Sequence, residues 1–311
     1  MKRHLRTILC FFLFALFVCA SWPVAASADT GPKPSVHVSF ENMGEELCYG
    51  TLLSKASSTG PYSVWDGSEE HAYRSRSDLS DDMWSEEIWY AFAGYEDADG
   101  YHYLEGTIWR VDQTKAYDWT YYPPHSFKIL LYYPQTARFV VSGICERYAF
   151  DSYYTVDLAQ ADAVSSGQGT DRPVGVVLQA RRSYPWQQET ISLVARILIT
   201  IAIEMGIALL FGFRSKKELL LLIIVNAITQ IALNVLLNII HFRSGQLAFL
   251  FGYFGLEFLV FVLEAAIYAV FLKKLSDRAR STGTYLLYAL VANVASFFVG
   301  LMIAVVLPGI F

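Results

Sequence analysis

Hydrophobic residues are concentrated in the C-terminal part of this chain, where residues 190–311 contain four long apolar runs. About 20 apolar helical residues cross a bilayer core of roughly 30 Å, and each run reaches that length. The pattern therefore predicts an all-α four-helix transmembrane domain, built from two similar hairpins. The expected spans are residues 190–213, 219–240, 247–272 and 284–307.

The portion before these runs has a different pattern, rich in aromatic and β-branched residues and interrupted by turn signals. Residues 36–40 alternate with period two, and residues 127–144 favour a β-hairpin. Helical spacing of apolar residues predicts one inserted helix over residues 81–92. We therefore expect a β-rich, sandwich-like domain over residues 29–180, followed by a juxtamembrane segment, residues 181–189.

Residues 1–28 have the pattern of a signal peptide, with three basic residues, an apolar stretch and an Ala26-Ser27-Ala28 cleavage site. This places the β-rich domain outside the cytoplasm. An uncleaved segment would act as an anchor and would leave the domain on the same side.

Basic residues predict how the chain threads the membrane. They gather in loops 214–218 and 273–283, whereas the intervening connection holds only His241 and Arg243. The positive-inside rule makes both basic loops cytoplasmic. The expected location is the cell membrane, with several passes and with the N-terminal domain and C-terminus outside.

Four polar residues interrupt the predicted spans at matching places: Glu204 and Asn226 in the first hairpin, Glu264 and Asn293 in the second. At about 1.5 Å per residue, each lies about 12–14 Å from the cytoplasmic edge, near the bilayer midplane. Facing lipid, they would lack hydrogen-bond partners, so we expect them to face the helix interior. The two carboxyls favour proton or cation handling, and a structural protonated pair is the alternative.

A second pair of charged residues lies nearer the outer surface. Arg196 and Glu257 are each about 22–26 Å from the cytoplasmic edge. Opposite charges at one depth predict an intramembrane ion pair between the first and third spans.

Charge is divided unevenly along the chain, whose net charge is −5. Residues 29–188 contain 23 acidic and 12 basic residues. Binding nucleic acid requires a basic surface, so the sequence excludes that partner for this domain. Scattered histidines lack metal-ligand spacing, and no cofactor motif occurs, so we expect neither metal nor cofactor. Asp97-Ala98-Asp99-Gly100 resembles half a calcium loop, but a plain turn is favoured.

Two cysteines remain beyond the predicted signal peptide, Cys48 and Cys145. An even pair in an oxidising compartment is compatible with a disulfide. Two buried thiols that pack as small hydrophobes are the equal alternative.

No catalytic motif identifies an enzyme: H-E-x-x-H, G-x-S-x-G and a phosphate-binding P-loop are all absent from the sequence. The leading hypothesis is an exported ligand- or partner-binding domain coupled to the transmembrane bundle. The alternative is a small transporter or channel subunit for protons or cations, and a cell-envelope enzyme is less favoured. Expected partners are the lipid bilayer, a membrane protein or a second copy, and a cell-envelope ligand at the exported domain. Its aromatic residues, including 121–124, are more often explained by core packing than by a stacking platform for that ligand.

Residues 33–36, 49–54 and 58–62 resemble the opening of a group of uncharacterised exported multi-pass membrane proteins from Gram-positive bacteria. The hairpin over residues 204–226 is similar to their membrane part. The group has no known activity, so the resemblance implies no functional residues.

Overall fold

The computed structural model describes residues 31–67, 85–105, 108–159, 176–276 and 280–306. The predicted signal peptide and its cleavage site lie outside the described residues. The chain divides into a β-rich unit, Pro32–Tyr184, and a helical unit that contains Pro185–Phe311.

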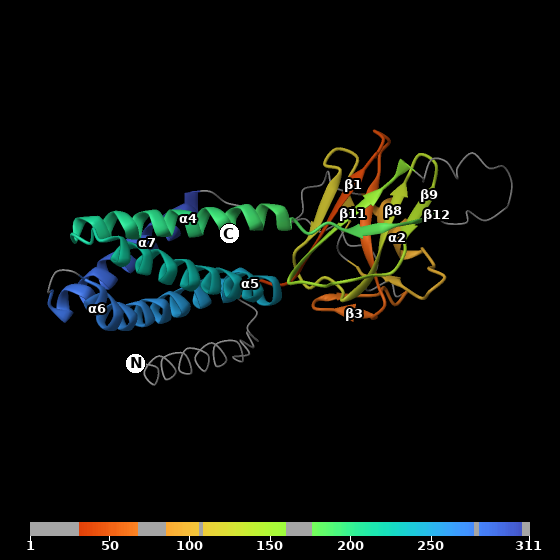
Figure 1. Ribbon diagram of the computed structural model, residues 1–311. Coiled ribbons are helices and arrows are strands. Elements are labelled where there is room, and N and C mark those ends of the chain that lie inside the picture. The colour runs from red at the N-terminus through yellow and green to blue at the C-terminus, as the bar shows by residue number, and fades with distance from the viewer. Residues whose placement is uncertain (1–30, 68–84, 106–107, 160–175, 277–279, 307–311) are drawn as a thin grey trace. The chain divides into compact units, whose positions relative to one another are not determined.

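Two sheets form the β-rich unit (Figure 1). In the smaller sheet, residues 35–41 pair in parallel with residues 151–157, and residues 36–39 pair in antiparallel fashion with residues 116–119. Its order is β13 (Ala180–Arg182), β11 (Asp151–Asp157), β1 (Ser35–Glu41) and β7 (Ala116–Trp119).

The larger sheet is centred on the predicted hairpin, whose two strands pair Leu130 with Val141 and Leu131 with Val140. Its main order is β12 (Val176–Leu178), β9 (Arg138–Ser142), β8 (Ser126–Tyr133), β2 (Tyr49–Ser54) and β5 (His102–Tyr103), with β6 (Trp109–Arg110) on β2 and β10 (Cys145–Glu146) on β8. A separate short hairpin joins β3 (Ser58–Thr59) and β4 (Tyr62–Ser63).

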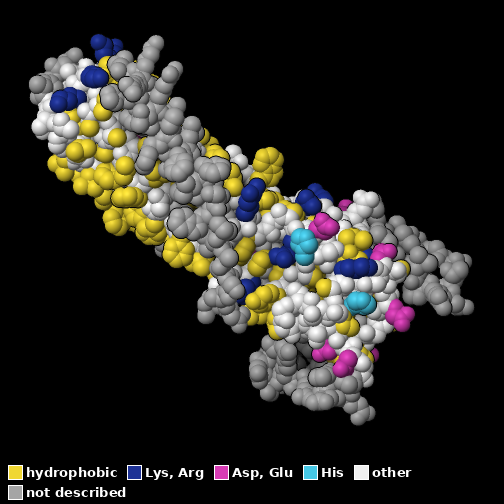
Figure 2. Space-filling model, turned by 90° about the horizontal axis from the view of Figure 1, so that it is seen from below, with side chains coloured by type: hydrophobic (Ala, Val, Ile, Leu, Met, Phe, Trp, Pro, Cys, Tyr) yellow, Lys and Arg dark blue, Asp and Glu magenta, His cyan; other side chains and the backbone are white. Residues whose placement is uncertain are grey.

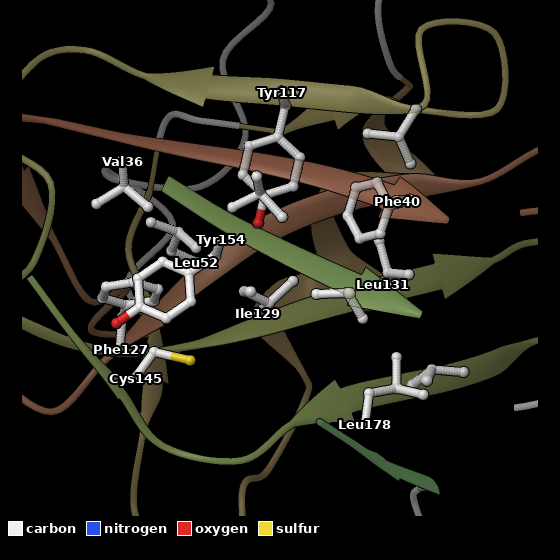
Figure 3. Packing of buried hydrophobic residues seen from close by; sticks show 14 of the residues in the cluster. Val36, Phe40, Leu52, Tyr117, Phe127, Ile129, Leu131, Cys145, Tyr154 and Leu178 are labelled. Atoms are coloured by element: carbon white, nitrogen blue, oxygen red, sulfur yellow. The ribbon is translucent and has the colours of Figure 1, made fainter. Parts of the chain in front are cut away.

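Alternating side chains from both sheets enclose one hydrophobic core, seen in Figure 3. Val36 and Phe40 enter it from β1, and Ile129 and Leu131 from β8. The other face of the larger sheet is covered by α2 (Glu86–Ala93), whose buried residues are Ile88, Trp89 and Phe92. The predicted inserted helix is therefore present, and the larger sheet is buried on both faces.

Among the described residues of the second unit, three helices are long and apolar enough to cross a membrane, with mean hydropathies of 2.2, 2.3 and 1.9. Figure 2 shows hydrophobic side chains along the described surface of this unit, with Lys and Arg gathered at one tip. These features indicate a membrane protein. In order the helices are α4 (Trp186–Leu210), α5 (Lys216–Ile267), the π-helical η2 (Tyr268–Leu272), α6 (Lys273–Leu275) and α7 (Thr282–Val306).

Helix α5 contains the second predicted span and most of the third, whose last five residues form η2, and it reverses direction at Gly245. This residue has φ 77° and ψ −175°, a conformation essentially restricted to glycine. Thr229 and Glu264 are hydrogen-bonded, although 35 residues of straight helix would separate them by about 52 Å. The two arms, residues 216–244 and 246–267, therefore run antiparallel.

The two basic loops meet at one end of the helical unit. Gly212, with φ 79°, ends α4 in a Schellman motif, in which the Phe213 N–H donates to Ala208 O at 2.9 Å. Arg280, just before α7, donates to Gly212 O at 2.6 Å and to Glu218 Oε1 at 2.9 Å. One guanidinium thus links the loop after α4, the start of α5 and the loop before α7.

Candidate functional site

The four polar residues predicted to share an interior position are all buried in the helical unit. Glu204 and Glu264 are each 0 % exposed, Asn226 is 1 % and Asn293 is 5 % exposed. They come from α4, the two arms of α5, and α7, which pack on one another. We call these four residues, together with the side chains that contact them, the polar centre.

Glu264 is held by a hydrogen-bond donor on each carboxyl oxygen. Thr229 Oγ1 donates to Oε1 at 2.6 Å, and Asn293 Nδ2 donates to Oε2 at 2.8 Å. The donors come from the first arm of α5 and from α7, so three helical segments converge on one carboxyl group. Short donors on both oxygens suit a charged carboxylate, because charge-assisted hydrogen bonds are the strongest.

Asn226 is fixed by Tyr268 at the start of the π-helical turn. Its Nδ2 donates to the Tyr268 hydroxyl at 3.1 Å and to Leu222 O at 3.0 Å. Single π-helical turns are frequent at functional sites, because the extra residue re-aims a side chain. Here the turn begins at the tyrosine that contacts the polar centre.

Glu204 differs from Glu264 in having no hydrogen-bond partner for either carboxyl oxygen among the described residues. Two further buried oxygens, Asn226 Oδ1 and Asn293 Oδ1, are unpartnered in the same way. Glu204 is within electrostatic reach of Glu264, and the Asn226 and Ser296 side chains lie near its carboxyl group without forming a hydrogen bond of good geometry to it. The polar centre therefore offers acceptor oxygens that need a proton or a cation.

Electrostatics around Glu204 are dominated by groups that can carry negative charge. Besides Glu264, the titratable groups within electrostatic reach are Glu257, Tyr268 and Tyr288. The Tyr288 hydroxyl donates to the Glu204 main-chain oxygen at 3.3 Å. Two dehydrated carboxylates cannot both stay charged here without a compensating charge, so the site is chemically suited to hold a shared proton or a small cation.

A cavity of about 430 Å³ adjoins the polar centre between the second arm of α5 and α7. Phenylalanine side chains line most of it, and Glu257 and Asn293 are its polar members. Asn293 both lines the cavity and donates to Glu264, so a single side chain connects the cavity with the polar centre. The Glu264 side chain itself is fully buried and does not line the cavity.

The ion pair between Arg196 and Glu257 stays a prediction. Tyr253 is within electrostatic reach of both side chains. The prediction matched the two residues by depth alone. Depth does not fix the direction in which each helix face points.

Cys48 and Cys145 are both buried free thiols, so the structure has the second of the two predicted alternatives. Cys145 pairs with Phe127 at one end of β8, while Tyr49, next to Cys48, pairs with Tyr132 at the other. Five residues of strand separate these positions by about 17 Å. A disulfide requires Cα atoms less than about 7 Å apart, which this register does not allow.

The half calcium loop is a turn closed by a lysine. Lys128 Nζ donates to Asp97 Oδ1 at 2.7 Å and to Asp99 Oδ2 at 2.6 Å. Lys128 and Asp97 are almost fully buried. The ammonium therefore occupies the place that a cation would take.

The structure also brings together a serine, a histidine and an aspartate that the sequence analysis did not single out. His37 Nε2 lies 2.7 Å from Ser35 Oγ, and its Nδ1 lies 2.7 Å from Asp118 Oδ1. This is the bonding order of a hydrolase triad. However, Ser35 is only 4 % exposed and its Oγ already donates to Asp151 Oδ1 at 2.5 Å, while its N–H donates to Phe150 O. We interpret the group as a network that joins β1, β7 and β11.

Two other contacts were also missed. Thr229 follows Asn226 by three residues and so shares its helix face, which was the available signal. Tyr288 gave no sequence signal, because tyrosines are common in apolar helices near membrane surfaces.

No family model matches this chain, and neither the curated proteins nor the solved structures contain a match to it.

Proposed function

We propose that this protein is a multi-pass membrane protein that binds and releases a proton at the polar centre, in concert with an exported ligand-binding domain. In this proposal α4, the two arms of α5 and α7 form a four-helix transmembrane bundle. The basic loops face the cytoplasm, and the β-rich domain and the C-terminus lie outside.

The threading is supported by the meeting of the two basic loops at Arg280. Lys216, Lys217, Lys273 and Lys274 belong to these same loops. At the opposite end, His241 Nδ1 lies 4.0 Å from Glu189 Oε1, close to the reversal of α5. Positive charge thus gathers at one end of the apolar segments, as expected for a cytoplasmic face.

The observation that carries the proposal is the unequal bonding of the two carboxyls. Glu264 receives two donors, whereas the oxygens of Glu204 receive none although the side chain is fully buried. An unpaired buried carboxylate is costly, so Glu204 requires a proton or a bound cation. In our proposal Glu264 carries the negative charge and Glu204 carries the proton.

The test uses the full chain reconstituted in vesicles that contain a pH-sensitive dye. Under an imposed potential we expect proton flux that is lost in Glu204→Gln and reduced in Glu264→Gln. Glu189→Gln is the matched control, because it makes the same change on α4 near the helix end. Wild-type flux in both centre variants would contradict proton movement.

A second measurement separates proton binding from transport. Infrared difference spectra across a pH step should contain the carbonyl band of a protonated carboxyl, and this band should disappear in Glu204→Gln. A band without flux would favour a proton-sensing role coupled to the exported domain. Sodium- or potassium-dependent flux without the band would favour the cation alternative.

A further inference from the structure

A separate cavity of about 430 Å³ lies in the β-rich unit, away from the hydrophobic cores. Three parts of the chain line it. They are residues from segment 54–59, which joins the end of β2 to β3, residues 123–126 at the start of β8, and Arg147 after β10. Its wall is fixed locally, because Thr59 Oγ1 donates to the Tyr122 carbonyl at 3.0 Å. Gly60, with φ 53°, also lies so close that a Cβ there would be 2.4 Å from Tyr122.

The charge of this cavity is opposite to that of its surroundings. Its lining includes Lys55, His125 and Arg147, and none of the described residues that line it is acidic. The segment from residue 29 to residue 188 carries a net charge of −11. A concave basic site within an acidic domain concentrates anions locally, because low-dielectric walls focus the field.

Arg147 supplies the cavity with a partly buried guanidinium group. Its Nε is buried and has no hydrogen-bond partner among the described residues. Burial lowers the pKa of Arg147, and no carboxylate in the described part of the chain offsets this effect. The main chain holds the residue in place, since the Arg147 N–H donates to His125 O at 2.9 Å. A partly buried guanidinium without a counter-charge is a receptor for an oxyanion.

The other polar groups define what the anion must look like. The Lys55 ammonium donates one of its three N–H groups to Asp99 O at 2.6 Å, so Lys55 contributes positive charge and further donors to the cavity. Ser58 is exposed and also lines the cavity. Several donors around one concave site suit the three terminal oxygens of a phosphate monoester better than the two coplanar oxygens of a carboxylate. The volume also accommodates a polyol or sugar-sized group beside the phosphate.

We propose that this cavity binds the phosphate group of a small phosphorylated polyol, with Arg147 as the principal anchor. The inference concerns the β-rich unit alone and does not depend on the polar centre. A glycerol phosphate occurs as a soluble monoester with three terminal oxygens and, in phosphatidylglycerol headgroups, as a diester with two.

The test is calorimetric titration of the full chain in phosphatidylcholine nanodiscs with glycerol 1-phosphate, inorganic phosphate, glycerol and acetate. We expect the two phosphates to bind, more weakly at high salt, and glycerol not to bind. Arg147→Met should weaken binding at least about tenfold, whereas Arg147→Lys should retain part of it. Arg138→Met is the matched control on β9, outside the cavity.

A second variant guards against misfolding. Ser58→Glu places a carboxylate on the exposed wall, leaves the cores untouched and should abolish phosphate binding. Repeating the titration in nanodiscs that contain phosphatidylglycerol distinguishes the sources, because a lipid-headgroup ligand would compete with glycerol 1-phosphate and a soluble ligand would not. Equal binding by wild type, Arg147→Met and Ser58→Glu, equal binding of acetate, or no binding of either phosphate would overturn the proposal.

Discussion

The two donors on Glu264 allow a quantitative test of the polar centre. In Thr229→Val a hydroxyl that lies 2.6 Å from Glu264 Oε1 is replaced by a methyl group of nearly equal size. A hydrogen bond to a charged group is worth about 1.5–3 kcal/mol, whereas side-chain bonds between membrane helices average about 0.6 kcal/mol. The bond is short and its acceptor is fully buried, so we expect a loss of about 1.5 kcal/mol.

The assay is a double-mutant cycle of Thr229→Val with Glu264→Gln. The free energy of unfolding of the helical unit in sodium dodecyl sulfate is measured for each variant by circular dichroism. If Glu264 is charged, the coupling energy should be about 1 kcal/mol or more, because the amide accepts a weaker bond. Thr190→Val is the control, because the Thr190 hydroxyl donates only to Trp186 O within its own helix. A coupling energy indistinguishable from zero would refute the assignment of a charged Glu264.

Three further predictions concern other parts of the chain. Gly245→Ala should destabilise the reversal of α5 by about 1–3 kcal/mol in the same unfolding assay. Gly255→Ala is the control and should not destabilise the helix, because a Cβ at Gly255 meets nothing within 4 Å. Burial raises the pKa of Cys48 to about 12 and of Cys145 to about 11, so mass spectrometry should find both unalkylated by iodoacetamide until the protein is unfolded. Hydrogen bonding from Arg110 lowers the pKa of Asp112, so its stabilisation is complete above the usual carboxyl pKa and is lost as pH falls through the lowered value. Asp112→Asn should therefore flatten the acid limb of a thermal-melting profile, and an unchanged limb would contradict the contact.

Sequence alone was sufficient for the features that depend on burial along one element. Polar residues in long apolar helices must face inward, and this rule was enough to expect Glu204 and Glu264 inside. The helical spacing around Ile88 likewise predicted α2, because an amphipathic face requires something to cover.

Features that depend on register or on rotation about a helix axis were not predictable. The parallel pairing of β1 with β11 joins residues 116 positions apart, and no local signal encodes it. The even number of cysteines contains no information on strand register, so it could not show that Cys48 and Cys145 lie too far apart for a disulfide. The connection after residue 240 was expected to be a loop, but α5 stays helical up to a single glycine.

The reversal at Gly245 has a consequence for how the protein would enter a membrane. Since one residue turns the chain, the two arms of α5 are tethered at minimal length and find each other with little loss of chain entropy. Thr229 can then satisfy Glu264 before either segment leaves the aqueous channel of the insertion machinery. The arms are thus suited to partition into lipid together, as one preassembled hairpin in which one of the two Glu264 oxygens is already hydrogen-bonded.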